Sequence, residues 1–209
     1  MKYKRLVVGP LQCNCAILSC EKTKEAIVID PGDEGPRIVS ELRAQGLTPK
    51  FVLHTHAHFD HVGGSKLLKQ TFSVPLCLHK GDEAIYQNLL LQGKMFGVPT
   101  EEGAPIDHFL EDGEEVIFGE YKVQVIHTPG HSPGGLSFRV ISGEEMLFSG
   151  DTLFQQSIGR TDLWGANTEQ LLKAVNDRLF VLDDDLPVHP GHGSSTTIGI
   201  EKRTNPFFA

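Results

Sequence analysis

Histidines and aspartates gather in one short run of the chain, His54-Thr55-His56-Ala57-His58-Phe59-Asp60-His61. His56 and His58 stand two apart, so in extended backbone their side chains point to the same side. Asp60 and His61 follow where the chain turns into the next predicted helix, and they can project at a second point nearby. Imidazole and carboxylate groups are ligands for zinc, iron or manganese. Four clustered donors are more than one metal ion usually takes from one segment, which favours a site for two ions.

Further donors follow predicted strands elsewhere in the chain. Residues 125–131 and residues 188–193 both end a strand on Pro-Gly-His, with His131 and His192 as the histidines. Proline stops the hydrogen-bond ladder and glycine allows a sharp turn, so each histidine is expected in a loop beyond the sheet edge. Between these two segments, an apolar strand is followed by Asp151. One carboxylate can bridge two cations and offset part of their mutual repulsion, which suits a two-ion site.

The elements that must position these donors alternate between strands and helices. Apolar runs bounded by turn residues predict strands over residues 15–18, 26–29, 51–53, 76–78, 116–118, 121–126, 136–141, 146–149 and 186–189. Helical spacing predicts one helix that begins near residue 38 and ends at Gly46, and others over 67–72, 82–91 and 168–180. The turn Asp30-Pro31-Gly32 ends the second strand, with the Asp30 side chain expected to bond its own backbone, and residues 93–107 form the longest irregular stretch. This mixture favours α/β layers with several loops gathered at strand ends.

Length, composition and charge narrow the class of protein. With 209 residues, 39% of them hydrophobic and 22% charged, the chain suits one compact domain and is not a disordered segment. The net charge of −8 disfavours nucleic acid or an anionic membrane as a partner. No apolar run approaches the ~20 residues of a membrane helix, and Leu6-Val7-Val8 is too short for a signal peptide. The four cysteines form no CxxC pair, so reduced packing thiols, Cys13 and Cys15 among them, and a cytoplasmic location are expected.

The motif His56-x-His58-x-Asp60-His61, followed by His131, Asp151 and His192, resembles the metallo-β-lactamase superfamily in both order and context. The resemblance covers nearly the whole chain. Within the superfamily, the chain is most similar to short, single-domain glyoxalase II-like (hydroxyacylglutathione hydrolase-like) hydrolases. The resemblance implies an α/β fold in which two sheets lie face to face with helices outside. This is a four-layer αβ/βα sandwich, formed by residues 1–209 as a single domain.

The resemblance also implies how the donors divide between two divalent metal ions. One ion would be held by His56, His58 and His131, the other by Asp60, His61 and His192, and Asp151 would bridge the two. A bound hydroxide would complete the bridge, and Asp60 would orient it as well as bind a metal ion. Zinc is the metal expected first, and iron or manganese also suits these ligands.

The reaction implied by the family is hydrolysis of a small-molecule thioester of the S-2-hydroxyacylglutathione kind. Two metal ions roughly 3.5–4 Å apart would hold a hydroxide at neutral pH, and its attack on the carbonyl carbon needs no serine or cysteine nucleophile. The sequence agrees, because it contains no GxSxG motif. Arg160 is the candidate for gripping a substrate carboxylate, and an internal ion pair with Asp162 is the alternative. Met95 and Phe96 either line the mouth of the pocket or pin the irregular stretch.

Other functions known in the same superfamily are alternatives to the thioesterase. A persulfide dioxygenase would use a single iron, by resemblance at His56, His131 and Asp151, and the ligand set alone does not separate it from a hydrolase. A lactonase is chemically close, whereas the negative charge weakens a nuclease and the missing export signal weakens a β-lactamase. From a different class, a metal-binding protein would hold both ions without turnover. Metal analysis combined with an activity screen distinguishes these functions.

Overall fold

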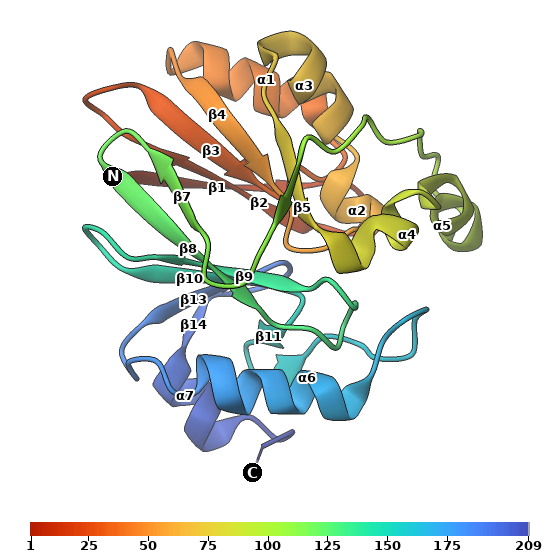
Figure 1. Ribbon diagram of the computed structural model, residues 1–209, viewed down its shortest axis with the longest axis vertical. Coiled ribbons are helices and arrows are strands. Elements are labelled where there is room, and N and C mark those ends of the chain that lie inside the picture. The colour runs from red at the N-terminus through yellow and green to blue at the C-terminus, as the bar shows by residue number, and fades with distance from the viewer. Residues whose placement is uncertain (209) are drawn as a thin grey trace.

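Two six-stranded sheets lie face to face in the computed structural model, which describes residues 1–208 (Figure 1). The first sheet has the order β1-β2-β3-β4-β5-β6 and the second has the order β14-β13-β10-β9-β8-β7. The strands of the first sheet are β1 (Lys2–Val8), β2 (Cys13–Ser19), β3 (Glu25–Ile29), β4 (Thr48–Leu53), β5 (Leu76–His79) and β6 (His108–Leu110). Those of the second are β7 (Glu115–Phe118), β8 (Tyr121–His127), β9 (Leu136–Val140), β10 (Met146–Gly150), β13 (Pro187–Pro190) and β14 (Thr196–Thr197). A small hairpin of β11 (Leu153–Phe154) and β12 (Ser157–Ile158) forms a separate two-stranded sheet next to the second sheet.

Helices cover the outer face of each sheet. The first half of the chain forms α1 (Gly35–Ala44), α2 (Phe59–Val62), α3 (Ser65–Phe72), α4 (Glu83–Tyr86) and α5 (Leu89–Phe96), with a 3-10 turn over Lys80–Asp82 before α4. The second half forms α6 (Thr168–Ala174), extended by a π-helical segment over Val175–Leu179, and α7 (Ile198–Thr204). In Figure 1, α1 and α3 lie above the first sheet, and α6 and α7 lie below the second.

Alternating side chains of the strands explain why the layers stack in this way. On β2, Ala16 and Leu18 point into the space between the sheets, and Phe118 and Phe138 meet them there from the second sheet. The intervening residues, such as Ile17, point to the other face. That outer face packs against apolar residues of α1 and α3, namely Ile38, Leu42 and Leu68.

The second sheet divides its side chains in the same manner. On β10, Phe148 belongs to the core between the sheets, whereas Leu147 packs outward against Val175 and Leu179. All of these side chains are buried. The result is the four-layer αβ/βα sandwich, so the expected α/β fold class is confirmed.

Each strand predicted from the sequence lies within, or overlaps, an observed one, but the region after β5 differs from the prediction. The helix expected over 82–91 is wrong, because α4 ends at Tyr86 and α5 begins anew at Leu89. The irregular stretch expected from residue 93 is also wrong at its start, since α5 continues to Phe96. Gly97 then ends the helix in the left-handed conformation (φ 68°), where its N–H bonds the Gly93 carbonyl oxygen.

Candidate metal centre

Four loops bring the predicted donors to one end of the sandwich. His56 and His58 lie in the loop after β4, which runs directly into α2. The other three loops follow β8, β10 and β13 of the second sheet. These strands run in the same direction, because β10 is parallel to β13 and β9 is antiparallel to both β8 and β10. Strands that share a direction end at the same edge of a sheet, so their following loops meet.

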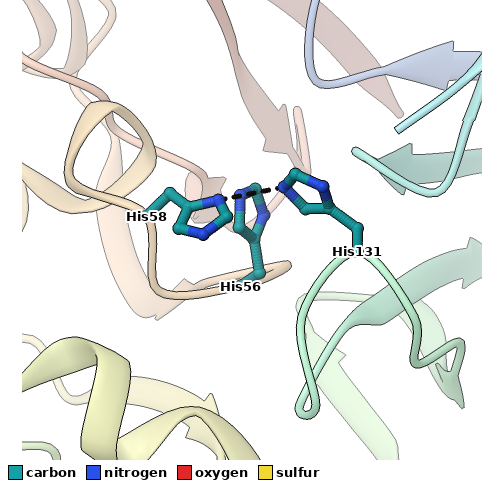
Figure 2. A group of neighbouring side chains, drawn as sticks. All are labelled: His56, His58 and His131. Carbon is teal, nitrogen blue, oxygen red and sulfur yellow. Dashed lines mark hydrogen bonds between the residues drawn. The ribbon is translucent and has the colours of Figure 1, made fainter. Parts of the chain in front are cut away.

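His56, His58 and His131 form the first group of donors. One donor atom from each lies within 4.8 Å of the others. The His131 Nε2 and His58 Nδ1 atoms are 2.9 Å apart, and the His56 ring lies next to both of these rings (Figure 2). The ring centroid of His56 is 4.7 Å from that of each partner. Three imidazole nitrogens thus converge on one point, which is the arrangement a tetrahedral metal ion requires.

Asp60, His61 and His192 form the second group, again with donor atoms within 4.8 Å. His192 Nε2 lies 3.1 Å from His61 Nε2 and 3.3 Å from Asp60 Oδ2. Asp151 stands between the two groups. Its Oδ2 is 3.6 Å from His131 Nε2 and 3.7 Å from His192 Nε2, while its Oδ1 is 3.5 Å from His61 Nε2. The Asp151 carboxylate therefore reaches donors of both groups.

The chemistry of these side chains fits divalent cations. His56 Nε2 and Asp151 Oδ1 are buried, and neither has a hydrogen-bond partner among residues 1–208. A buried polar atom without a partner is costly, and a cation would satisfy both. Burial lowers the pKa of His56 well below its usual value and that of His58 to about 3, so both imidazoles are neutral, as metal ligands must be. Burial opposes the charge of Asp60, but the neighbouring His61 and His192 lower the pKa of its carboxyl group overall.

Asp30 orients a donor of the second group, a role that the sequence analysis missed. Its Oδ2 accepts a hydrogen bond from His61 Nδ1 at 2.9 Å, which turns the opposite ring nitrogen toward the cluster. The backbone N–H of Thr55 and its hydroxyl donate to the same carboxylate, at 2.8 and 2.6 Å. The expected bond of the Asp30 side chain to its own backbone is therefore wrong. The left-handed backbone of Asp30 (φ 49°) accompanies this buried network.

Asp82 is a second supporting residue that local sequence signals did not reveal. Its buried carboxylate accepts hydrogen bonds from the backbone N–H of Ala57 at 3.0 Å, the Ser132 hydroxyl at 2.8 Å and the Gly134 N–H at 2.5 Å. Burial raises the pKa of Asp82, and these three donors oppose that rise. An aspartate near the start of a predicted helix is ordinary in sequence. Its partners lie 25 to 52 positions away, so only the folded chain identifies them.

Other histidines and the cysteines pack as structural groups. His54 Nδ1 lies 2.8 Å from the Cys77 carbonyl oxygen, and its Nε2 lies 2.6 Å from the Ser65 hydroxyl, so the imidazole is used within the fold. His127 donates to the Pro133 carbonyl oxygen at 3.0 Å and thereby supports the loop of His131. The four cysteines are free and buried, which confirms the expectation of packing thiols.

A cavity of about 420 Å³ opens over the donors. Arg160 lines it, and the Arg160 guanidinium pairs with the Asp162 carboxylate through Nε and a terminal nitrogen, at 2.6 and 2.7 Å. The Arg160 carbonyl oxygen accepts a hydrogen bond from His131 Nδ1 at 2.8 Å. Of the two residues expected at the mouth, Phe96 lines the cavity, whereas Met95 is not among the lining residues and is 73% exposed.

Comparison with known proteins decides the family. A model described as the metallo-beta-lactamase superfamily matches residues 8–192, a span that contains all seven donors. The chain belongs to the metallo-beta-lactamase superfamily. Two curated relatives cover nearly its whole length. The "Probable metallo-hydrolase YqgX" of Bacillus subtilis is 38% identical and aligns over 99% of this chain and 97% of the relative. The "Hydroxyacylglutathione hydrolase GloC" of Haemophilus influenzae is 36% identical over 99% and 98%.

Solved structures of the superfamily share this fold. BLEG-1, described as a B3 metallo-beta-lactamase, has a TM-score of 0.92 and 39% identity, with 99% of each chain covered. TTHA1623, solved in a di-iron-bound form, has a TM-score of 0.89 and 40% identity, with 98% of this chain and 99% of that one covered. The metallo-beta-lactamase superfamily binds divalent metal ions, and its relatives place this chain among the metallo-hydrolases. No helix within residues 1–208 is long and apolar enough to cross a membrane.

Proposed function

We propose that the chain is a metal-dependent hydrolase of thioesters of the S-2-hydroxyacylglutathione type. The observation that carries this proposal is the position of Asp151, whose carboxylate reaches donors of both groups. The name of the Haemophilus influenzae relative supports the substrate class. The substrate is a small molecule rather than a nucleic acid or a membrane, and we propose the cytoplasm as the location.

The seven donors divide between two divalent cations in this proposal. The first cation would be held by His56, His58 and His131 and the second by Asp60, His61 and His192, while the Asp151 carboxylate, which lies near donors of both groups, would serve both. Zinc suits nitrogen and oxygen donors of this kind. Iron and manganese are accepted by the same donors, and the di-iron-bound form of TTHA1623 is an example among similar proteins.

When bound, such cations lower the pKa of water and polarise the substrate carbonyl group. The chain's own residues hold and orient the reactants. The Asp60 carboxylate, kept ionised, accepts a hydrogen bond from the attacking water and directs its lone pair toward the acyl carbon. The water oxygen forms a bond to that carbon, the carbon–sulfur bond breaks, and its electron pair leaves on sulfur. The products are a carboxylic acid and a thiol, with the protons taken from water.

No covalent acyl intermediate is part of this mechanism. Burial raises the pKa of Cys13 and of Cys77 to about 12 and that of Cys15 well above its usual value, so none of these three supplies a thiolate at neutral pH. Hydrogen bonds with Thr23 lower the pKa of Cys20 to about 7, but Cys20 lies after β2, beside Thr23 and Gly119, and does not line the cavity over the donors. None of the residues lining the cavity over the donors is a cysteine. Water is therefore the nucleophile that the geometry leaves available.

The test combines metal quantification with an activity screen on one preparation. We expect about two divalent ions per chain and release of free thiol from S-2-hydroxyacylglutathione thioesters. About one iron per chain, with oxygen uptake on a persulfide, would instead identify the persulfide dioxygenase. Faster cleavage of lactones than of any thioester would identify a lactonase. Two bound ions without turnover on either panel would indicate a metal-binding protein.

A further inference from the structure

The walls of the cavity above the donors are apolar. Six apolar side chains from separate segments line it: Leu11, Phe59, Phe96, Phe154, Ile158 and Leu163. They come from the β1–β2 turn, α2, α5, the β11–β12 hairpin and the loop that follows it. The donors occupy the inner end, since His58, Asp60, His131, Asp151 and His192 also line the cavity. Its volume of about 420 Å³ is in the range of small-molecule sites.

The two long polar side chains of this wall, Gln92 and Arg160, already have partners within the protein. Gln92 uses both ends of its amide, accepting from the Phe59 N–H at 3.1 Å and donating to the Ile85 carbonyl oxygen at 2.8 Å. Arg160 is the only lysine or arginine among the described residues that line the cavity. Two nitrogens of the Arg160 guanidinium donate hydrogen bonds to the two carboxylate oxygens of Asp162, which offsets the positive charge of Arg160.

We infer that this site selects its substrate by apolar contact with the acyl substituent and does not grip the carboxylates of the glutathione portion. The inference rests on the proposed thioester hydrolysis. The carbonyl carbon must reach the donors, so the group bonded to it is held beside them, against the apolar wall. A large apolar substituent there loses contact with water, and its binding energy rises with the area buried. Among the described residues that line the cavity, no unpaired lysine or arginine is available to bind the carboxylates of glutathione.

The first test varies the acyl group on a constant thiol. We would measure kcat/KM for the glycoloyl, lactoyl and mandeloyl thioesters of glutathione, whose substituents are hydrogen, methyl and phenyl. Each value is divided by the rate of hydroxide-catalysed hydrolysis of the same ester, which removes differences in intrinsic reactivity. We expect the corrected kcat/KM to rise about 10-fold or more from methyl to phenyl.

The second test varies the thiol on a constant acyl group. The lactoyl and mandeloyl thioesters of N-acetylcysteamine carry no carboxylate and replace the glutathione thioesters. Because the described wall presents no unpaired cation, we expect kcat/KM for the neutral thioester to lie within about threefold of the glutathione value. The comparison is repeated at low and high salt. If a cationic side chain bound the glutathione carboxylates, high salt would lower kcat/KM for the glutathione thioester but not for the neutral one.

A pair of variants on one helix links the preference to the wall. Phe96 lines the cavity and is 43% exposed, so Phe96→Ala is expected to fold. This variant should reduce the mandeloyl-to-lactoyl ratio about fivefold, because part of the apolar contact is lost. Met95→Ala is the matched control, since Met95 lies on the same helix, is exposed and does not line the cavity. Its ratio should stay at the unmodified value.

The possible results separate this inference from the proposed function. A protein with its full metal content that hydrolyses none of the thioesters would overturn the proposed function. Thioester hydrolysis with no rise from methyl to phenyl would overturn the inference alone. The same holds for a preference of more than about 10-fold for glutathione over the neutral thiol. Equal effects of Phe96→Ala and Met95→Ala on the ratio would also count against the inference.

Discussion

The Asp82 carboxylate accepts a hydrogen bond at 3.0 Å from the backbone N–H of Ala57, the residue that separates His56 from His58. The same carboxylate binds the Ser132 hydroxyl, immediately after His131. One buried side chain thus joins the two loops that carry the first group of donors. Together with the bond from the Leu136 N–H to the Thr55 carbonyl oxygen, this link helps to hold the two loops at a set distance.

Replacement of Asp82 should therefore weaken metal binding at the three-histidine group. In Asp82→Ala, three buried donors lose their acceptor, at a cost of about 1–3 kcal/mol each if water does not replace it. We expect the affinity of one of the two metal ions to fall about 10- to 100-fold, as for other residues that orient metal ligands. Competition titration with a chromophoric chelator measures both affinities.

Ser132→Ala serves as the graded comparison for Asp82→Ala. It removes one of the three hydrogen bonds and leaves the carboxylate in place, so its effect should be the smaller. Circular dichroism and the melting temperature of each metal-free variant show whether the fold is retained. If folded Asp82→Ala bound both ions as tightly as the unmodified protein, Asp82 would have no role in positioning the donors.

The Asp30→Asn variant should act on the second group instead. The Asp30 carboxylate accepts from His61 Nδ1, and an asparagine amide offers one acceptor where three donors now converge. We expect weaker binding of the ion held by Asp60, His61 and His192, with the ion held by His56, His58 and His131 less affected. In the same chelator titration, the affinity of the ion in the second group should fall while that of the other changes little. An equal fall in both affinities would contradict separate support of the two groups.

Removal of metal should lower the thermal stability of the protein. Each ion that binds only the folded state stabilises it by about 2.7 kcal/mol when its free concentration is 100 times Kd. For a chain of this size, that corresponds to a rise in Tm of about 5–10 °C for each ion. Differential scanning fluorimetry of chelated protein, before and after addition of zinc, measures this shift. His131→Ala should show a smaller response, and an unchanged Tm on adding zinc to the chelated protein would argue against a metal centre.

Protonation of His189 should destabilise the protein in mild acid. Burial lowers the pKa of His189 to about 4, assisted by the charge of Arg5, while the unfolded value is about 6.5. The unfolded chain therefore binds the proton more readily. The contribution of the neutral His189 imidazole to the free energy of unfolding is complete above pH 6.5, is lost as the pH falls toward 4, and changes little below that.

Melting curves of metal-free protein between pH 7.5 and 4.5 provide the measurement. In His189→Gln the titrating group is absent, so Tm should fall less steeply than in the unmodified protein. Ser195→Ala removes the hydrogen bond to His189 Nδ1 but keeps the imidazole against Phe148, so it should retain the steep fall. Parallel curves for the unmodified protein and His189→Gln would show that this imidazole does not contribute.

Local patterns predicted the main strands and where they end, because alternation of apolar residues and turn chemistry act within a few positions. They did not predict β1. Its exposed positions include Lys2, Arg5 and Val7, so apolar and polar residues do not alternate regularly along this edge strand. Nor did they predict the break between α4 and α5. At the break, the Asn88 backbone N–H bonds the Ile85 carbonyl oxygen three residues back, while the Asn88 side-chain amide donates to the Ala84 carbonyl oxygen that a continuous helix would use.

The sequence by itself determined which donors exist, that strand ends deliver them into loops, and, by resemblance, the superfamily. Tertiary structure alone decided how those donors are supported and what surrounds them. Asp30 and Asp82 act on partners at least 25 positions away, and Leu11 and Leu163 reach one cavity from opposite parts of the chain. Side-chain type and backbone preference are local properties, whereas an orienting hydrogen bond or a cavity wall exists only where distant segments are packed together.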